Sequence, residues 1–76
     1  MQKESVLKIM KAKKSEMIEI AKKEKEYPLI KVSSEKEEML INNEDEILFL
    51  ENAIGINLGR HVYKIKYDDI NEIVLN

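Results

Sequence analysis

The stretch that decides the fold is AIGINLGRHVYKIKY, which spans residues 53–67. Apolar side chains alternate with other residues on both sides of a turn at Asn57–Arg60. Period-two alternation is typical of half-buried strands, and Gly59 can take the positive φ that a tight hairpin connection favours. The stretch therefore predicts a β-hairpin. The side chains expected to face the core across it are Ile54, Ile56, Leu58, Tyr63, Ile65 and Tyr67.

The segments on either side of this hairpin also favour short strands. Residues 29–33 predict a strand with Ile30 and Val32 on one face. Residues 34–51 leave two readings open: a second helix opened by a Ser34–Glu37 capping box, or two strands at 37–41 and 46–51 joined by a turn at 42–45. The two strands are favoured, because paired asparagines would interrupt the helix. Residues 68–69 predict a turn, followed at 70–75 by a last strand or a single helical turn.

Residues 4–26 predict an amphipathic helix, since they contain neither Gly nor Pro and are rich in Lys, Glu, Ala, Met and Leu. Pro28 cannot continue a helix and marks its end. Lys13 and Lys14 interrupt the apolar stripe. The centre of that stripe consists of Val6, Met10, Met17, Ile20 and Ala21.

These elements predict an α+β fold in one domain over residues 1–76. Its helix, at about residues 4–26, precedes a β-rich part at about 28–76, a small antiparallel sheet or half-barrel of about four to six short strands.

Residues 46–75, and within them VYKIKYDDINEI at 62–73, resemble part of bacterial pleckstrin-homology-like domains. The resemblance implies a twisted antiparallel sheet used for binding. The chain departs from that family in being shorter and in having its long helix first.

The residue inventory predicts a chain that is not an enzyme and carries no cofactor or metal. The sequence has no cysteine and one histidine, His61, whereas a structural zinc site normally needs four ligands. None of the serines lies in a nucleophile-elbow motif, and Gly55 and Gly59 match no phosphate-binding loop. No apolar run is long enough for a signal peptide or a membrane span, so a cytoplasmic location without membrane contact is expected.

The function expected by exclusion is protein binding. Residues 1–26 hold eight Lys and five Glu, a balance of +3, and residues 27–76 hold four Lys and one Arg against ten Asp and Glu, a balance of −5. The prediction is a small regulator or inhibitor, of the kind that phages and mobile elements carry, and it is expected to form a homodimer. The helix stripe Val6, Met10, Met17, Ile20 and Ala21 is the expected interface with the second copy.

The alternative is a small nucleic-acid-binding regulator. Five lysines follow one side of the predicted helix and could track phosphates. Against it stand the net charge of −2 and the single Arg. The lysines concerned are Lys8, Lys11, Lys14, Lys22 and Lys25.

Overall fold

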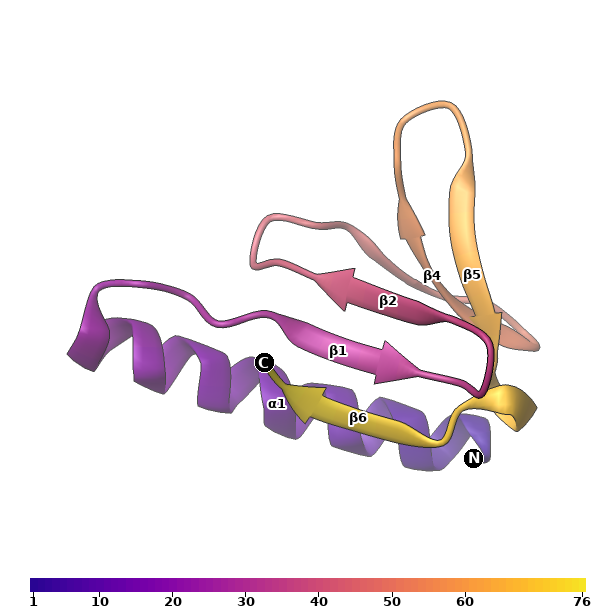
Figure 1. Ribbon diagram of the computed structural model, residues 1–76, viewed down its shortest axis with the longest axis horizontal. Helices are drawn as coiled ribbons and strands as arrows, with labels where there is room; N and C mark the ends of the chain where they lie inside the picture. Colours follow the sequence, from indigo (N-terminus) through magenta and orange to yellow (C-terminus); the bar gives the residue numbers. More distant parts are fainter.

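A computed structural model describes all 76 residues and consists of one helix, six strands and one short 3-10 helix. The α+β class is therefore confirmed. In Figure 1 the helix lies lengthwise below the strands, and the hairpin at residues 53–66 projects away from it. The elements in chain order are α1 (Lys3–Glu24), β1 (Ile30–Ser33), β2 (Glu38–Ile41), β3 (Ile47–Phe49), β4 (Ala53–Asn57), β5 (Val62–Lys66), η1 (Tyr67–Asp69) and β6 (Glu72–Leu75).

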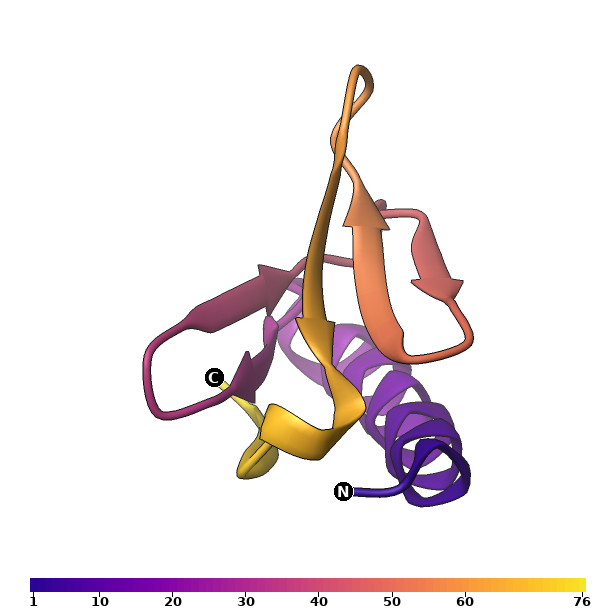
Figure 2. The same cartoon turned by 90° about the vertical axis from the view of Figure 1, so that its right-hand side faces the viewer.

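The strands form two antiparallel sheets of three strands each. The first has the order β2-β1-β6 and the second the order β3-β4-β5. The sheets approach each other where β2 lies near β5, and there the Tyr63 hydroxyl donates a hydrogen bond to the Glu38 carbonyl oxygen at 3.3 Å. Figure 2 shows β3 at the outer margin of the second sheet, with α1 passing below it.

The helix begins and ends close to the predicted residues. Lys25 follows α1 in a left-handed conformation with φ of 65°, and its N–H donates to the Ala21 carbonyl oxygen at 2.9 Å. This bond satisfies one of the free carbonyls at the end of the helix. Pro28 comes three residues later, where the chain turns back into β1.

One hydrophobic core joins the helix to both sheets. α1 packs against β6 and β1, and its side chains Val6, Met10 and Met17 are at most 1% exposed. Burial of these side chains holds the helix in place, since removing apolar surface from water stabilises by about 25 cal/mol per Å². The buried members of the core are Val6, Met10, Met17, Ile30, Val32, Met39, Ile41, Ile54, Ile56, Ile65, Tyr67, Ile70 and Ile73.

Residues 34–51 form two strands, as favoured, and no second helix. The turn between them is closed by Asn42, whose side-chain oxygen accepts hydrogen bonds from the N–H groups of Glu44 and Asp45. The Ser34 hydroxyl does accept from the Glu37 N–H at 3.0 Å, the bond a capping box would contain. It serves the β1–β2 turn instead, because a side chain that caps three residues ahead fits a tight turn as well as a helix.

The predicted hairpin is confirmed in its register and wrong at two of its residues. Ile54 pairs with Ile65 and Ile56 with Tyr63. Leu58, expected in the core, lies in the loop and is 48% exposed, because β4 ends at Asn57. Tyr67 is buried as predicted, but it begins η1 rather than facing a residue across the hairpin. Gly59 has a φ of 93°, the positive value its place in the turn required.

Beyond η1, which occupies the predicted turn, residues 72–75 form the last strand, β6, beside β1. The strand reading of residues 70–75 is therefore the correct one. Of the structure's helices, none is both long and apolar enough to cross a bilayer.

Candidate protein-binding groove between α1 and β3

An open groove separates α1 from the edge strand β3. On the helix side it is lined by Leu7, Lys11 and Lys14, whose spacings of four and three residues place them on one face. On the strand side it is lined by Ile47 and Phe49, which are two residues apart and so share a face of β3. The groove encloses about 340 Å³. We call this feature the α1–β3 groove.

The floor of the α1–β3 groove is buried and its apolar walls are partly exposed. Met10, at the floor, is 1% exposed and belongs to the core. Leu7 on one wall and Phe49 on the other are 37% and 38% exposed. Ile18 lies eleven residues after Leu7, which is about three helical turns, and at 42% exposure it extends the apolar wall along α1. The groove therefore presents apolar surface that the core does not use.

The edge of β3 that borders the groove carries free backbone groups. β3 is hydrogen-bonded to β4 alone. The bonds Asn57 N–H to Glu46 O (3.1 Å) and Leu50 N–H to Ala53 O (2.9 Å) show that the even-numbered residues of this strand point their backbone groups toward β4. Alternation in an antiparallel ladder then turns the N–H and C=O groups of Ile47 and Phe49 outward.

The charges at the groove are positive. Lys11 is exposed and Lys14 is half-buried, which fits a stem packed on apolar surface with its ammonium group in water. Elsewhere on α1, Lys13 lies 3.4 Å from Glu16 and Lys22 lies 3.4 Å from Glu19, although most lysines of the chain make no ion pair. Neither Lys11 nor Lys14 has an ion-pair partner within the chain.

The structure corrects the interface expected on the helix. Val6, Met10 and Met17 are 0 to 1% exposed and pack into the chain's own core, so they offer no surface to a second copy. Ile20 and Ala21 are half-buried toward the C-terminal end of α1. For these three buried residues the expectation is wrong, because the strands cover the centre of the stripe. The apolar residues left exposed lie along one edge, at Leu7 and Ile18.

Of the five lysines of the nucleic-acid alternative, Lys8, Lys11, Lys14 and Lys22 lie on one side of α1, and Lys25 directly follows its last residue. Lys8, Lys11, Lys22 and Lys25 are exposed, and Lys14 is half-buried. Only Lys11 and Lys14 line the α1–β3 groove. Lys22 is held by Glu19, and Lys25 follows the last turn of α1 with a left-handed backbone.

Sequence reasoning missed the strand side of the groove. Residues 46–51 predict a strand, but nothing in their sequence says that the strand lies at the edge of a sheet. A signal was present on the helix, where Leu7 and Ile18 flank the main stripe and stand near Lys11 and Lys14. To infer that this side of the helix faces β3, one needs the order of the strands in the sheet.

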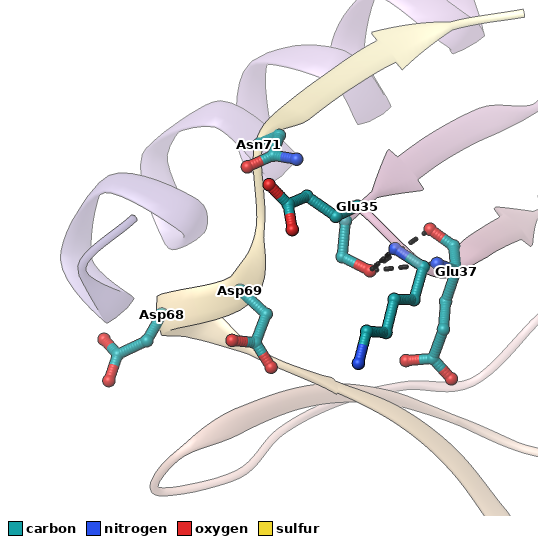
Figure 3. Close-up of a pocket in the computed structure, with 7 residues that line it drawn as sticks. Glu35, Glu37, Asp68, Asp69 and Asn71 are labelled. Atoms are coloured by element: carbon teal, nitrogen blue, oxygen red, sulfur yellow. Dashed lines mark hydrogen bonds between the residues drawn. The ribbon is translucent and has the colours of Figure 1, made fainter.

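A second, polar hollow of about 290 Å³ lies between the β1–β2 turn and η1. Figure 3 shows that Asp68 and Asp69 point in different directions, so these sequence neighbours do not act as paired carboxylates. Lys36 also lines the hollow, and the chain contains no group of three or more His, Cys, Asp or Glu that could hold a metal ion. The other residues around it are Ser34, Glu35, Glu37 and Asn71.

The lone histidine, His61, is exposed in the loop of the β4–β5 hairpin, where its carbonyl oxygen accepts a hydrogen bond from the Leu58 N–H. This loop is the part that projects away from α1 in Figures 1 and 2.

Comparison of the chain with protein-family models, curated proteins and solved structures gave no match. The resemblance of residues 46–75 to pleckstrin-homology-like domains therefore stays a prediction.

Proposed function

We propose that this chain is a non-catalytic protein-binding module, a small regulator or inhibitor that docks another protein in the α1–β3 groove. The observation that carries the proposal is the groove itself. It combines an apolar floor with exposed apolar walls at Leu7 and Phe49. Apolar surface gathered in a concave site is typical of a place where a partner is bound.

The fold leaves apolar surface of Leu7 and Phe49 uncovered. The core already closes over Met10, so the exposed parts of Leu7 and Phe49 contribute nothing to folding. Covering both side chains with a partner would release water from apolar surface, which favours association by about 25 cal/mol per Å² buried. A regulator that acts by occupying its partner needs no further chemistry in the chain.

Nucleic-acid binding is less well supported by the same groove. Its surface is apolar between the lysines, whereas a phosphate track needs continuous positive charge and favours Arg. The chain has one Arg, Arg60, which lies in the β4–β5 loop rather than on α1. Nucleic-acid binding would weaken steeply with salt, and binding through apolar contacts would not.

The proposal is tested by comparing two matched variants in affinity capture from host lysate. Phe49→Asp places a charge on the groove wall, and Leu58→Asp makes the same change in the exposed hairpin loop. We expect a protein retained by the original chain and by Leu58→Asp, but lost with Phe49→Asp, in about 0.15 M salt. Circular dichroism must show that both variants are folded.

Two results count against the proposal. Retention of the same proteins by all three chains would mean that the groove takes no part in binding. Retention of nucleic acid, lost on raising the salt, would favour the phosphate-binding alternative. Leu7→Asp provides a second groove variant from the helix side, in case Phe49→Asp does not fold.

A further inference from the structure

We infer that the ligand of the α1–β3 groove is an extended segment of another protein, rich in acidic and apolar residues, that adds a strand to the open edge of β3. This inference rests on the proposed function and specifies its partner. Three observations carry it: the free backbone groups of β3, the apolar wall formed by α1, and the unpaired lysines between them.

The backbone of β3 is complementary to an extended chain. Ile47 and Phe49 each direct one N–H and one C=O away from β4, by the alternation of the ladder. An extended segment beside them can form hydrogen bonds with all four groups. This is strand addition, in which backbone bonds give affinity and alternate side chains give specificity. A bound helix would leave the same four groups without partners.

The side chains of an added strand would meet α1. Successive side chains of a strand point to opposite faces, so every second residue would share the face of Ile47 and Phe49. That face borders Leu7 and the floor at Met10. Apolar residues at alternate positions would therefore fill the groove, with the intervening residues directed to the other face.

The charge of the ligand follows from the lysines. Lys11 and Lys14 are one turn apart at the wall of the groove, and no carboxylate of the chain pairs with either. Carboxylates on the same face of the added strand, two residues before or after an apolar position, would pair with them. A basic segment would be repelled, so these two side chains select an acidic segment.

The same charges argue against a second copy as the occupant. If the β3 strands of two copies paired across a two-fold axis, the interface would be isologous. Each copy would then contribute its own Lys11 and Lys14 as well as Glu46 and Glu51 beside the ends of β3, so four lysines would gather at one interface. An acidic segment from a different protein neutralises these charges instead.

The inference is tested with a phage-displayed library of random peptides, selected on the full chain and counter-selected on Phe49→Asp. We expect enriched peptides in which acidic residues accompany apolar residues at every second position. N-methylation of alternate backbone amides in a synthetic copy of such a peptide should weaken binding about tenfold or more, because it removes edge hydrogen bonds. Methylation of the amides between them should have a much smaller effect.

The lysines are tested with the same synthetic peptide. Lys11→Glu combined with Lys14→Glu should weaken its binding about tenfold or more. Lys8→Glu combined with Lys22→Glu changes the charge of α1 by the same amount outside the groove and should have a much smaller effect. Equal effects of the two pairs would show that binding depends on overall charge and would overturn the inference.

The failures of the inference and of the proposed function are distinguishable. Enriched peptides can depend on the groove and yet have helical spacing, basic residues or binding that N-methylation does not change. Such peptides would overturn strand addition and leave protein binding at the groove intact. Peptides that bind Phe49→Asp equally well, or no enrichment at all, overturn the inference, and the capture experiment then decides the proposed function. A dimer in sedimentation that Phe49→Asp dissociates places a second copy in the groove and also overturns the inference.

Discussion

The Tyr67 hydroxyl donates a hydrogen bond to the carbonyl oxygen of Leu50 at a distance of 2.7 Å. Tyr67 opens η1, and Leu50 directly follows β3, so this bond fastens the turn before β6 to the corner between β3 and β4. Tyr67 is 4% exposed, and its ring belongs to the core. The bond therefore helps to set the position of the strand that borders the α1–β3 groove.

Tyr67→Phe should lower the free energy of unfolding by about 0.5 to 1.5 kcal/mol, because it removes this bond and keeps the ring. Tyr27→Phe is the matched control. Tyr27 is 48% exposed, and its hydroxyl makes no hydrogen bond within the chain, so that change should stay within about 0.5 kcal/mol. Urea unfolding measures both. Equal stability of the two variants would show that the bond makes no net contribution.

The same hydroxyl gives a prediction about pH. Burial raises the pKa of Tyr67 above its ordinary value of 10.0. The pKa of Tyr63 is raised as well, by burial first and then by the negative charge of Glu37. A raised pKa means that the folded chain holds the proton more tightly than the unfolded chain, so the stabilisation is complete below about pH 10 and falls as the pH rises above it.

Unfolding free energies measured between about pH 8 and about pH 11 should therefore decline above about pH 10. Tyr67→Phe should decline less steeply than the original chain, since one of the two responsible groups is absent. Tyr63→Phe should reduce the slope in the same sense. Parallel curves for the original chain and Tyr67→Phe would contradict the link between burial of Tyr67 and its protonation.

The sequence predicted the elements well where a pattern was local. The end of α1 near Pro28, the turn at Gly59 and the pairing of Ile54 with Ile65 depend on residues that are neighbours or face each other across a hairpin. It failed where the outcome depended on distant packing. Burial of Met17 reflects the strands that cover α1, and the free edge of β3 reflects the absence of a second strand beside it.

The expected burial of Leu58 is the clearest local error of the sequence prediction, and a substitution can test it. Alternation with Ile54 and Ile56 placed it in the core, but the strand ends one residue earlier and the loop exposes it. Ile54→Ala should cost about 2 to 5 kcal/mol, as expected for a fully buried side chain, whereas Leu58→Ala should cost less than about 1 kcal/mol. A large loss from Leu58→Ala in urea unfolding would restore the original assignment of the face.

Met17 and Ile18 are neighbours on α1 with opposite environments. Substitutions at these two residues therefore distinguish effects on folding from effects on association. Met17 is 0% exposed in the core, and Ile18 is 42% exposed on the side of α1 that also carries Leu7. Met17→Glu would bury a charge without a partner, so we expect it to unfold the chain or to cost more than about 3 kcal/mol. Ile18→Glu should leave the melting temperature nearly unchanged, because its carboxylate stays in water.

Circular dichroism melts at several protein concentrations give the measurement, since a stabilising dimer makes the melting temperature depend on concentration. The structure predicts that Met17→Glu lowers the melting temperature equally at every concentration, because Met17 lies within the core of a single chain. If Met17 instead formed an interface between copies, the variant would stay folded as a monomer and lose only the dependence on concentration. That result would show that the centre of the stripe lies at the surface. It would contradict the packing of α1 against β6.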